Sequence, residues 1–493
     1  MQIQLDSPYQ IRVPANDNGP PMKRYEALAS DIEASIRNGT LKTGDRLPSV
    51  RHTGSSRGVS ASTVFQAYYL LEARGLVRAR DRSGYYVAGG GLRDAPPETT
   101  LTSRPAEGPR ALEVSDQVFD ILEASMSRQV VPFGSAFPSP LLFPLARLGQ
   151  FMAASAKSLD PWRTVDDLTP GLAELRRQIS QRYLIDGIEV PAEDIVITNG
   201  ALEALNLSIA AVTSPGDAVL VESPCFYATL QTLERNGLRA IEVPTHPRDG
   251  IDLDALEAAI ERHAPRACWL MPTFQNPLGA TMPEAAKRAL VDLLSRHDIA
   301  LIEDDVYAEL HYGPKRLLPA KAYDRDGRVM HCSSFSKCLA PGYRIGWVAA
   351  GRFRQAIARA KLTTTLNTNV PAQLAIARYL QRGGYDRHLR RLRSSLAILQ
   401  VQYIDAVARH FPEGTRVTRP LGGYFLWVEL PPGSDALALH RRALAAGISI
   451  APGPIFSARR EFSHGLRLNC GHPLDERAEA ALRQLGEWAA QPA

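Results

Sequence analysis

The chain has few cysteines and no long apolar run. Its 493 residues include five cysteines, which are scattered and form no Cys-x-x-Cys pair. This odd number predicts neither a disulfide framework nor a zinc site, so we expect a reduced, cytoplasmic protein without a bound metal. No run of about 18 apolar residues occurs, and a membrane-spanning helix is not predicted. Residues 1–21 lack the apolar core of a secretory signal and are predicted to be a disordered tail.

Positive charge is concentrated near the N-terminus. Residues 21–90 hold eleven Lys and Arg against six Asp and Glu, which accounts for the whole net charge of +5. A basic module on an otherwise neutral chain is typical of a nucleic-acid-binding appendage. The apolar fraction of 45% is high enough for large buried cores and excludes a wholly disordered chain.

Three zones are predicted along the chain. Residues 22–88 read as three helices and a hairpin. Residues 89–130 are rich in Gly and Pro, include Gly89-Gly90-Gly91, and are predicted to be a linker. Residues 131–493 alternate short apolar strands with amphipathic helices, which indicates an α/β fold with a mostly parallel sheet.

The N-terminal zone has the pattern of a helix-turn-helix with a basic wing. Ser60 is expected to cap the third helix, because its hydroxyl can accept a backbone N–H of the first turn. A second short helix is expected to open at Pro48. Val64, Ala67, Tyr68 and Leu71 form the inner face of the third helix, and Ser62, Thr63 and Gln66 lie opposite. A small helical cap or a dimerisation module fits the same spacing.

The sequence motifs of this zone resemble those of the GntR family of bacterial regulators. They read Gly44-Asp45-Arg46-Leu47-Pro48-Ser49-Val50-Arg51, Gly58-Val59-Ser60-x-Ser62-Thr63-Val64 and Ser83-Gly84-Tyr85-Tyr86-Val87. The resemblance implies a winged helix-turn-helix that binds duplex DNA. The residues that it places at the DNA are Arg51, Ser60, Ser62, Thr63 and the wing residues Arg80 and Arg82. Residues 52–56 depart from the family, which has a more apolar segment there, and could weaken the packing of the second helix.

Polar residues follow four apolar runs of the third zone. The runs are 195–198, 267–271, 299–302 and 329–332, and the residues that follow them include Gly200, Asn276, Asp304, Tyr307 and Lys337. Ligands bind beyond the carboxyl ends of strands in open α/β sheets, so these residues are expected to line one crevice. Each one taken singly also fits a solvated loop.

This set of side chains fits pyridoxal phosphate. A Lys can form a Schiff base with its aldehyde, and a carboxylate can keep the ring nitrogen protonated. Asn and Tyr can hydrogen-bond the phenolate oxygen, while Ser, Arg and helix N–H groups can hold the phosphate.

Residues 131–490 resemble the fold-type I aminotransferases. The motifs that carry the resemblance are Ser334-x-Ser336-Lys337-x-Leu339-Ala340-Pro341-Gly342-x-Arg344-x-Gly346-Trp347, Asn276-Pro277-x-Gly279, Asp304-x-x-Tyr307 and Arg467-Leu468-Asn469. The resemblance implies a seven-stranded, mostly parallel sheet and a small C-terminal α+β domain from about residue 390 to 493. It makes Lys337 the catalytic, Schiff-base lysine and gives the others these roles: Asp304 at the pyridine nitrogen; Asn276 and Tyr307 at the phenolate oxygen; Gly200, Ala201, Ser334, Ser336 and Arg344 at the phosphate; Phe226 stacked on the ring; and Arg467 at an amino acid's α-carboxylate.

Two positions depart from this second family. Phe226 stands where the family usually has Tyr or Trp, so it can stack without offering a hydroxyl. Asp166 and Asp167 lie where relatives carry a Tyr that reaches the partner subunit's phosphate. Carboxylates would repel a phosphate, and this contact is expected to be absent or rearranged.

A GntR-like head joined to an aminotransferase-like body resembles the MocR-type regulators. The resemblance implies a homodimeric, pyridoxal-phosphate-dependent transcriptional regulator that senses an amino compound or a B6 vitamer. Two alternatives stay open. The first is an aminotransferase acting on an amino acid with a 2-oxo acid. The second is a cofactor-storage protein, but this alternative leaves the GntR-like motifs unexplained.

Overall fold

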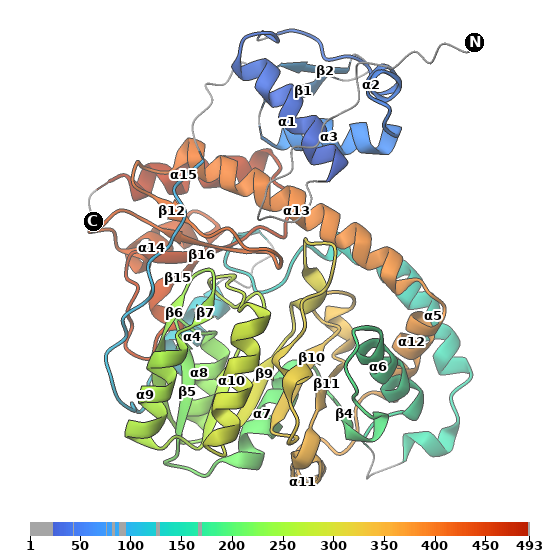
Figure 1. The fold of residues 1–493 in the computed structure, drawn as a ribbon, viewed down its shortest axis with the longest axis vertical. Coiled ribbons are helices and arrows are strands. Elements are labelled where there is room, and N and C mark those ends of the chain that lie inside the picture. Colours follow the sequence, from blue (N-terminus) through green and yellow to red (C-terminus); the bar gives the residue numbers. More distant parts are fainter. Residues whose placement is uncertain are drawn as a thin grey trace, which may run out of the picture.

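A computed structural model shows a small N-terminal head above a large α/β body (Figure 1). It describes residues 23–42, 44–74, 76–80, 84–87, 95–124, 129–165 and 170–491. The predicted tail, Arg82 of the wing, and Asp166 with Asp167 fall outside the described residues. Expectations about them therefore stay predictions.

The head has the element order that the sequence predicts. Its elements are α1 (Arg24–Arg37), α2 (Val50–Arg57), α3 (Ala61–Ala73), β1 (Val77–Arg80) and β2 (Gly84–Val87). Leu28 of α1 packs with Val64 and Leu71 of α3, and all three side chains are fully buried. The two strands pair antiparallel as the predicted hairpin.

The second helix begins later than predicted and is held by polar contacts. Ser49 caps α2 by accepting the N–H of His52, so Pro48 precedes the cap instead of opening the helix. Thr53 lies in residues 52–56, the segment that differs from the GntR family. It is buried, and its hydroxyl oxygen lies 2.6 Å from that of Tyr68. The Tyr68 hydroxyl also donates to the carbonyl of Pro48. These hydrogen bonds hold α2 against α3.

Much of the segment predicted to be a linker lies on the body. The N–H of Arg110 donates to the carbonyl of Ala240, and the N–H of Ser103 donates to the carbonyl of Thr245. Helix α4 (Ser115–Ala124) follows, with Val118 buried against the body. Gly and Pro composition predicted the lack of regular structure before Leu112, but not this docking.

One large sheet forms the centre of the body. Its order is β4 (Ile195–Thr198), β11 (Gly346–Ala349), β10 (Val329–Ser334), β9 (Ala300–Asp304), β8 (Ala267–Leu270), β5 (Ala218–Ser223), β6 (Arg239–His246), β7 (Gly250–Ile251). The five strands from β10 to β6 are mutually parallel, and β11 runs antiparallel to both of its neighbours. The short β7 adds one antiparallel strand to the expected seven. The carboxyl ends of β9 and β10 therefore meet at one edge.

Helices cover both faces of this sheet. They are α5 (Leu145–Lys157), α6 (Ala173–Ile185), α7 (Ala201–Val212), α8 (Tyr227–Arg235), α9 (Leu253–His263), α10 (Glu284–Arg296), α11 (Arg354–Leu362) and α12 (Val370–Gln381). Every residue of β4, β8, β9 and β10 is buried, which agrees with the continuous apolar character of such strands in a sheet covered on both faces.

The C-terminal part forms a second, smaller layer. Helix α13 (Tyr385–His410) crosses from the large sheet to the base of the head (Figure 1). A four-stranded sheet follows, in the order β12 (Arg416–Val417), β13 (Phe425–Glu429), β16 (Gly465–Asn469), β15 (Ala451–Pro452). Helix α14 (Ala436–Ala445) packs on β15, and α15 (Glu476–Ala489) packs on α13 and α14. Strand β3 (Val131–Pro132) pairs with β14 (Ile448–Ser449), so the chain after α4 enters the body beside this layer.

None of the described helices is long and apolar enough to cross a membrane. All five cysteines are buried and free. Within the described ranges, no group of three His, Cys, Asp or Glu side chains is arranged to hold a metal ion.

Candidate cofactor and DNA sites

The predicted phosphate-binding residues converge at the start of α7. Gly200 has a φ of 82° and precedes Ala201, the first residue of the helix. Arg344 lies so close to Gly200 that a Cβ atom there would collide with its guanidinium. Arg344 also donates to the hydroxyl of Ser336, and the N–H of Ser336 donates to the hydroxyl of Ser334, both at 3.3 Å. A helix N-terminus, two hydroxyls and a guanidinium together form an anion site.

Lys337 follows β10 and points its amine into the body. The amine donates to the carbonyl of Ala136 at 2.8 Å and lies 3.6 Å from the centre of the Phe137 ring. Burial of the amine lowers the pKa of Lys337 to about 7, and the positive charges of Arg467 and Arg344 add to this. A substantial fraction of the amine is therefore neutral near pH 7, and a neutral amine is the form that attacks a carbonyl.

Asp304 is the last residue of β9 and is almost fully buried. Burial and the neighbouring Asp305 raise the pKa of its carboxyl to about 7, although Lys337 acts in the opposite direction. Its Oδ1 has no hydrogen-bond partner among the described residues. A buried carboxylate of this kind fits a ligand that brings an N–H of its own.

Arg467 joins the C-terminal layer to the site. It is fully buried on β16 and donates to Asn276 Oδ1 at 2.9 Å and to the carbonyl of Gly134 at 2.7 Å. Its guanidinium lies 4.2 Å from the ring centre of Phe425, and burial lowers its pKa. The amide nitrogen of Asn276 has no partner among the described residues and remains available to a ligand.

Tyr307 and Phe226 complete the predicted set. Tyr307 is buried and its ring meets that of Tyr424 edge-on at 5.5 Å; burial raises its pKa well above the usual value. Phe226 precedes α8, and its ring centre lies 4.7 Å from that of Tyr227, a buried residue that interacts electrostatically with Arg467. Phe226 is thus linked to the site through Tyr227, a residue that the sequence analysis did not single out.

The sequence analysis also missed a loop that crosses the site. Residues 134–137 turn their carbonyl groups toward site residues: Gly134 toward Arg467, Ala136 toward Lys337 and the Tyr424 hydroxyl, and Phe137 toward Asn469. No motif marks this loop, because its backbone carbonyls make these contacts. Asn469 belongs to the Arg467-Leu468-Asn469 motif, but the sequence analysis assigned it no role.

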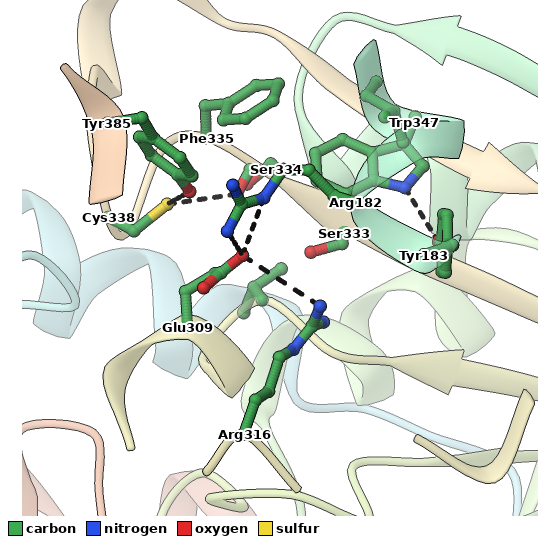
Figure 2. Close-up of a pocket in the computed structure, with 12 residues that line it drawn as sticks. Arg182, Tyr183, Glu309, Arg316, Ser333, Ser334, Phe335, Cys338, Trp347 and Tyr385 are labelled. Atoms are coloured by element: carbon green, nitrogen blue, oxygen red, sulfur yellow. Dashed lines mark hydrogen bonds and ion pairs between the residues drawn. The ribbon is translucent and has the colours of Figure 1, made fainter. Parts of the chain in front are cut away.

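A partly buried ion-pair cluster lies beside the site (Figure 2). Glu309 sits between Arg182 and Arg316, and Arg393 of α13 pairs with the same carboxylate at 3.0 Å. Burial alone would raise the pKa of Glu309, but the three arginines lower it to about 2. The cluster keeps the turn after Tyr307 fixed against α13.

The head presents the predicted DNA-facing residues at its surface. The Ser60 hydroxyl accepts the N–H of Thr63 and lies 2.8 Å from the hydroxyls of Ser62 and Thr63. Arg51, Ser60 and Ser62 are exposed, while Thr63 is partly buried. The side chain of Arg80 is outside the described part. Arg46, which the sequence analysis did not assign to DNA, lies against Gly84 of the wing.

Two protein families match the chain in separate regions. Residues 24–87 match the gntR family of bacterial regulatory proteins, and residues 167–483 match the class I and II aminotransferases. The HTH-type transcriptional regulator YdcR of Escherichia coli (strain K12) is 47% identical over 94% of this chain and 99% of its own length. YjiR of the same organism is 41% identical over 94% of this chain and 98% of its own.

Solved structures resemble the body. The multiple substrate aminotransferase from Thermococcus profundus is 28% identical, with a TM-score of 0.68, over 75% of this chain and 94% of its own. Since the relatives that span both parts are HTH-type regulators, the chain belongs to the family of HTH-type transcriptional regulators in which a GntR head is joined to an aminotransferase class I and II domain.

Proposed function

We propose that this protein binds operator DNA through its head, binds pyridoxal phosphate in its body, and changes its DNA affinity when an amino compound or a B6 vitamer reaches that site. The observation that carries the proposal is that Asp304, Arg344 and Arg467 all act on the amine of Lys337, and that Arg467 donates to Asn276, in a chain whose recognition helix has an exposed face.

The residues present fit pyridoxal phosphate. Asp304 would face the ring N–H, Asn276 and Tyr307 the phenolate oxygen, and the Gly200–Ser336–Arg344 cradle the phosphate. When bound, this cofactor supplies an aldehyde that reacts with amines and a ring that accepts electrons. Asp304 Oδ1 and Asn276 Nδ2, which have no partner among the described residues, support the assignment, because each would gain a hydrogen bond.

Trapping on lysine tests the cofactor assignment. The protein incubated with pyridoxal phosphate should turn yellow, and borohydride should then attach the cofactor to Lys337, as read by peptide mapping. Lys337→Ala should lose the label. Lys315→Ala, which removes an exposed lysine elsewhere in the body, should keep it. A label on another lysine of the wild type would contradict the assignment.

Arg467 favours an effector that carries a carboxylate. Its guanidinium donates to the carbonyls of Gly134 and Ser135, which a carboxylate could replace through a two-point contact. Lys337 lies in the same site, bound to the carbonyl of the next residue, Ala136. The arrangement therefore fits an amino acid, with its amine toward Lys337 and its carboxylate toward Arg467.

Helix α13 offers a route from this site to the head. At one end, Arg393 donates to both the carboxylate and the carbonyl of Glu309, which lies in the turn after Tyr307. About 12 Å further along the helix, Val401 packs against the apolar core of the head. Asp405 lies near Arg74 and Glu33 of the head; burial raises its pKa to about 6.

A titration with DNA tests the coupling. Operator affinity should change by roughly 5–150-fold when an effective amino acid is added, the usual range of allosteric coupling. Lys337→Ala should abolish the response and keep basal DNA binding, because the head folds around its own core. A full response of Lys337→Ala to an amino acid would mean that sensing does not pass through this lysine.

We infer that the protein forms a homodimer. Large apolar side chains are exposed near α5 and α6, including Leu141 (86% exposed), Trp162 (79%) and Ile185 (79%). A second copy of the chain would remove such side chains from water. Light scattering should give twice the mass of 54.0 kDa, and Trp162→Ser should shift the equilibrium toward the monomer.

Aminotransferase activity is the second candidate. Support for it comes from the side chains near Lys337, since Asp304 and Arg467 act on its pKa and Arg467 donates to Asn276. Brisk transfer of an amino group to a 2-oxo acid, together with a DNA affinity that no amine alters, would favour this enzyme over the regulator.

A further inference from the structure

The exposed face of the recognition helix carries an aromatic side chain. Ser62, Phe65, Gln66 and Tyr69 of α3 are spaced so that they form one stripe, and all four are exposed. Phe65 is 54% exposed and Tyr69 is 51% exposed. The opposite face, which includes Val64 and Tyr68, is buried in the core of the head. Phe65 is therefore not needed for the packing of the head.

This stripe belongs on the side of α3 that meets DNA. In helix-turn-helix proteins the N-terminal part of the second helix of the motif contacts base edges in the major groove. Ser62 lies in the first turn of α3, and Phe65 and Gln66 lie one turn later. Arg51 at the exposed start of α2 adds a positive charge nearby in the motif that can contact a phosphate.

The major groove offers one apolar group to such a ring. Among the base edges that it displays, only thymine presents a methyl group, at C5, while the other groups donate or accept hydrogen bonds. A phenyl ring makes no hydrogen bond, so it gains nothing from guanine or cytosine edges and gains apolar burial from thymine.

We propose that Phe65 selects thymine in the operator by packing against its C5 methyl group. The proposal rests on the DNA-binding function proposed above and adds a residue that sets its specificity. Gln66 lies beside Phe65 and can form two hydrogen bonds with an adenine. The two side chains together specify A·T pairs in the operator.

The test uses duplexes selected from a random library by the full-length protein. Each thymine of a selected duplex is replaced in turn by deoxyuridine, which lacks only the methyl group. At one thymine per half-site, the replacement should weaken wild-type binding by about fourfold, which corresponds to the loss of one buried methyl group. At that position cytosine should bind less well than 5-methylcytosine, since the latter restores a methyl group at C5.

Two variants assign the effect to Phe65. Phe65→Ala should bind thymine and deoxyuridine duplexes equally, while Phe65→Leu should keep part of the preference. Phe119→Ala removes an exposed phenyl ring from α4 of the body and should behave as wild type. If the wild type shows no methyl dependence, or Phe65→Ala keeps it in full, the proposal is wrong. If the wild type enriches no duplex at all, the DNA-binding function itself fails.

Discussion

Lys337 and Asp304 act on each other electrostatically, and each favours the charged form of the other. Burial opposes both effects and is the larger cause in each case, so both groups have a pKa of about 7. The Lys337 amine and the Asp304 carboxyl can therefore each gain or lose a proton near neutral pH. A cofactor whose ring N–H donates to Asp304 would stabilise the charged carboxylate and lower its pKa.

The stability of the cofactor-free protein should reflect this buried carboxyl. The pKa of Asp304 is raised from 3.8 to about 7, so between these values the folded chain holds a proton that the unfolded chain has lost. The free energy of unfolding therefore falls as the pH rises through this window. Asp304→Asn removes the effect, and its stability relative to wild type should improve by roughly 2–3 kcal/mol between pH 5 and pH 8.

Urea unfolding of both cofactor-free proteins at the two pH values measures this difference. Asp254→Asn changes an exposed carboxylate on α9 and is the control, for which the difference from wild type should be the same at both. A constant difference for Asp304→Asn as well would contradict the prediction. The same variant should bind pyridoxal phosphate more weakly, because an amide cannot balance a protonated ring nitrogen.

Arg467 should decide which amines act as effectors. Arg467→Ala should weaken the response to carboxylate-bearing amines by about 10–100-fold, the loss expected for a hydrogen bond to a charged group. The responses to the cofactor alone and to a simple alkylamine should remain. Arg467→Lys keeps the charge but not the planar fork, and it should restore only part of the response. An undiminished amino-acid response in Arg467→Ala would place the carboxylate elsewhere.

Arg393 should be needed for coupling but not for DNA binding. Arg393→Gln removes the ion pair with Glu309 at the body end of α13, while Val401 still packs against the head. Basal operator affinity should stay within about twofold, and the effector response should fall toward none. Arg390→Gln, an exposed arginine one turn earlier on the same helix, is the matched control and should respond as wild type does. Operator titrations with and without effector distinguish the two.

Arg51 should contribute a phosphate contact. Arg51→Ala should weaken DNA binding for all sequences, and the slope of log K against log salt should become less steep by about 0.9, the value for one neutralised phosphate. Arg359→Ala removes an exposed arginine of α11 on the body and should change neither quantity. If both variants behave alike, DNA contact does not pass through Arg51.

Short-range patterns predicted most of the site. The runs before Gly200, Asp304 and Lys337 became β4, β9 and β10, with ends within two residues of expectation. Parallel strands place their carboxyl ends at one edge, so the order of residues along the chain was enough to predict that they converge. The head was predicted in the same way, apart from the start of α2 at Ser49.

Contacts between distant segments could not be read in the same way. The carbonyl of Gly134 meets Arg467 across 333 positions of the chain, and Arg393 meets Glu309 across 84. Such pairs follow no period, and a backbone carbonyl carries no sequence signal. The docking of residues 95–114 on the body is of the same kind, since their composition indicates only the absence of regular structure.

The sequence by itself determined the two modules, the strands and helices, and the sheet edge at which polar residues meet, because local periodicity and the geometry of a parallel sheet are sufficient for these. The roles of the lysine, the carboxylate and the arginines are predictions that rest on the resemblance of their motifs to the aminotransferases. The tertiary structure decided the pKa values of Lys337 and Asp304, because burial sets them, and the loop at residues 134–137 that covers Arg467. It also decided that one helix, α13, contacts both the turn after Tyr307 and the core of the head, since only packing in three dimensions brings those surfaces to the same helix.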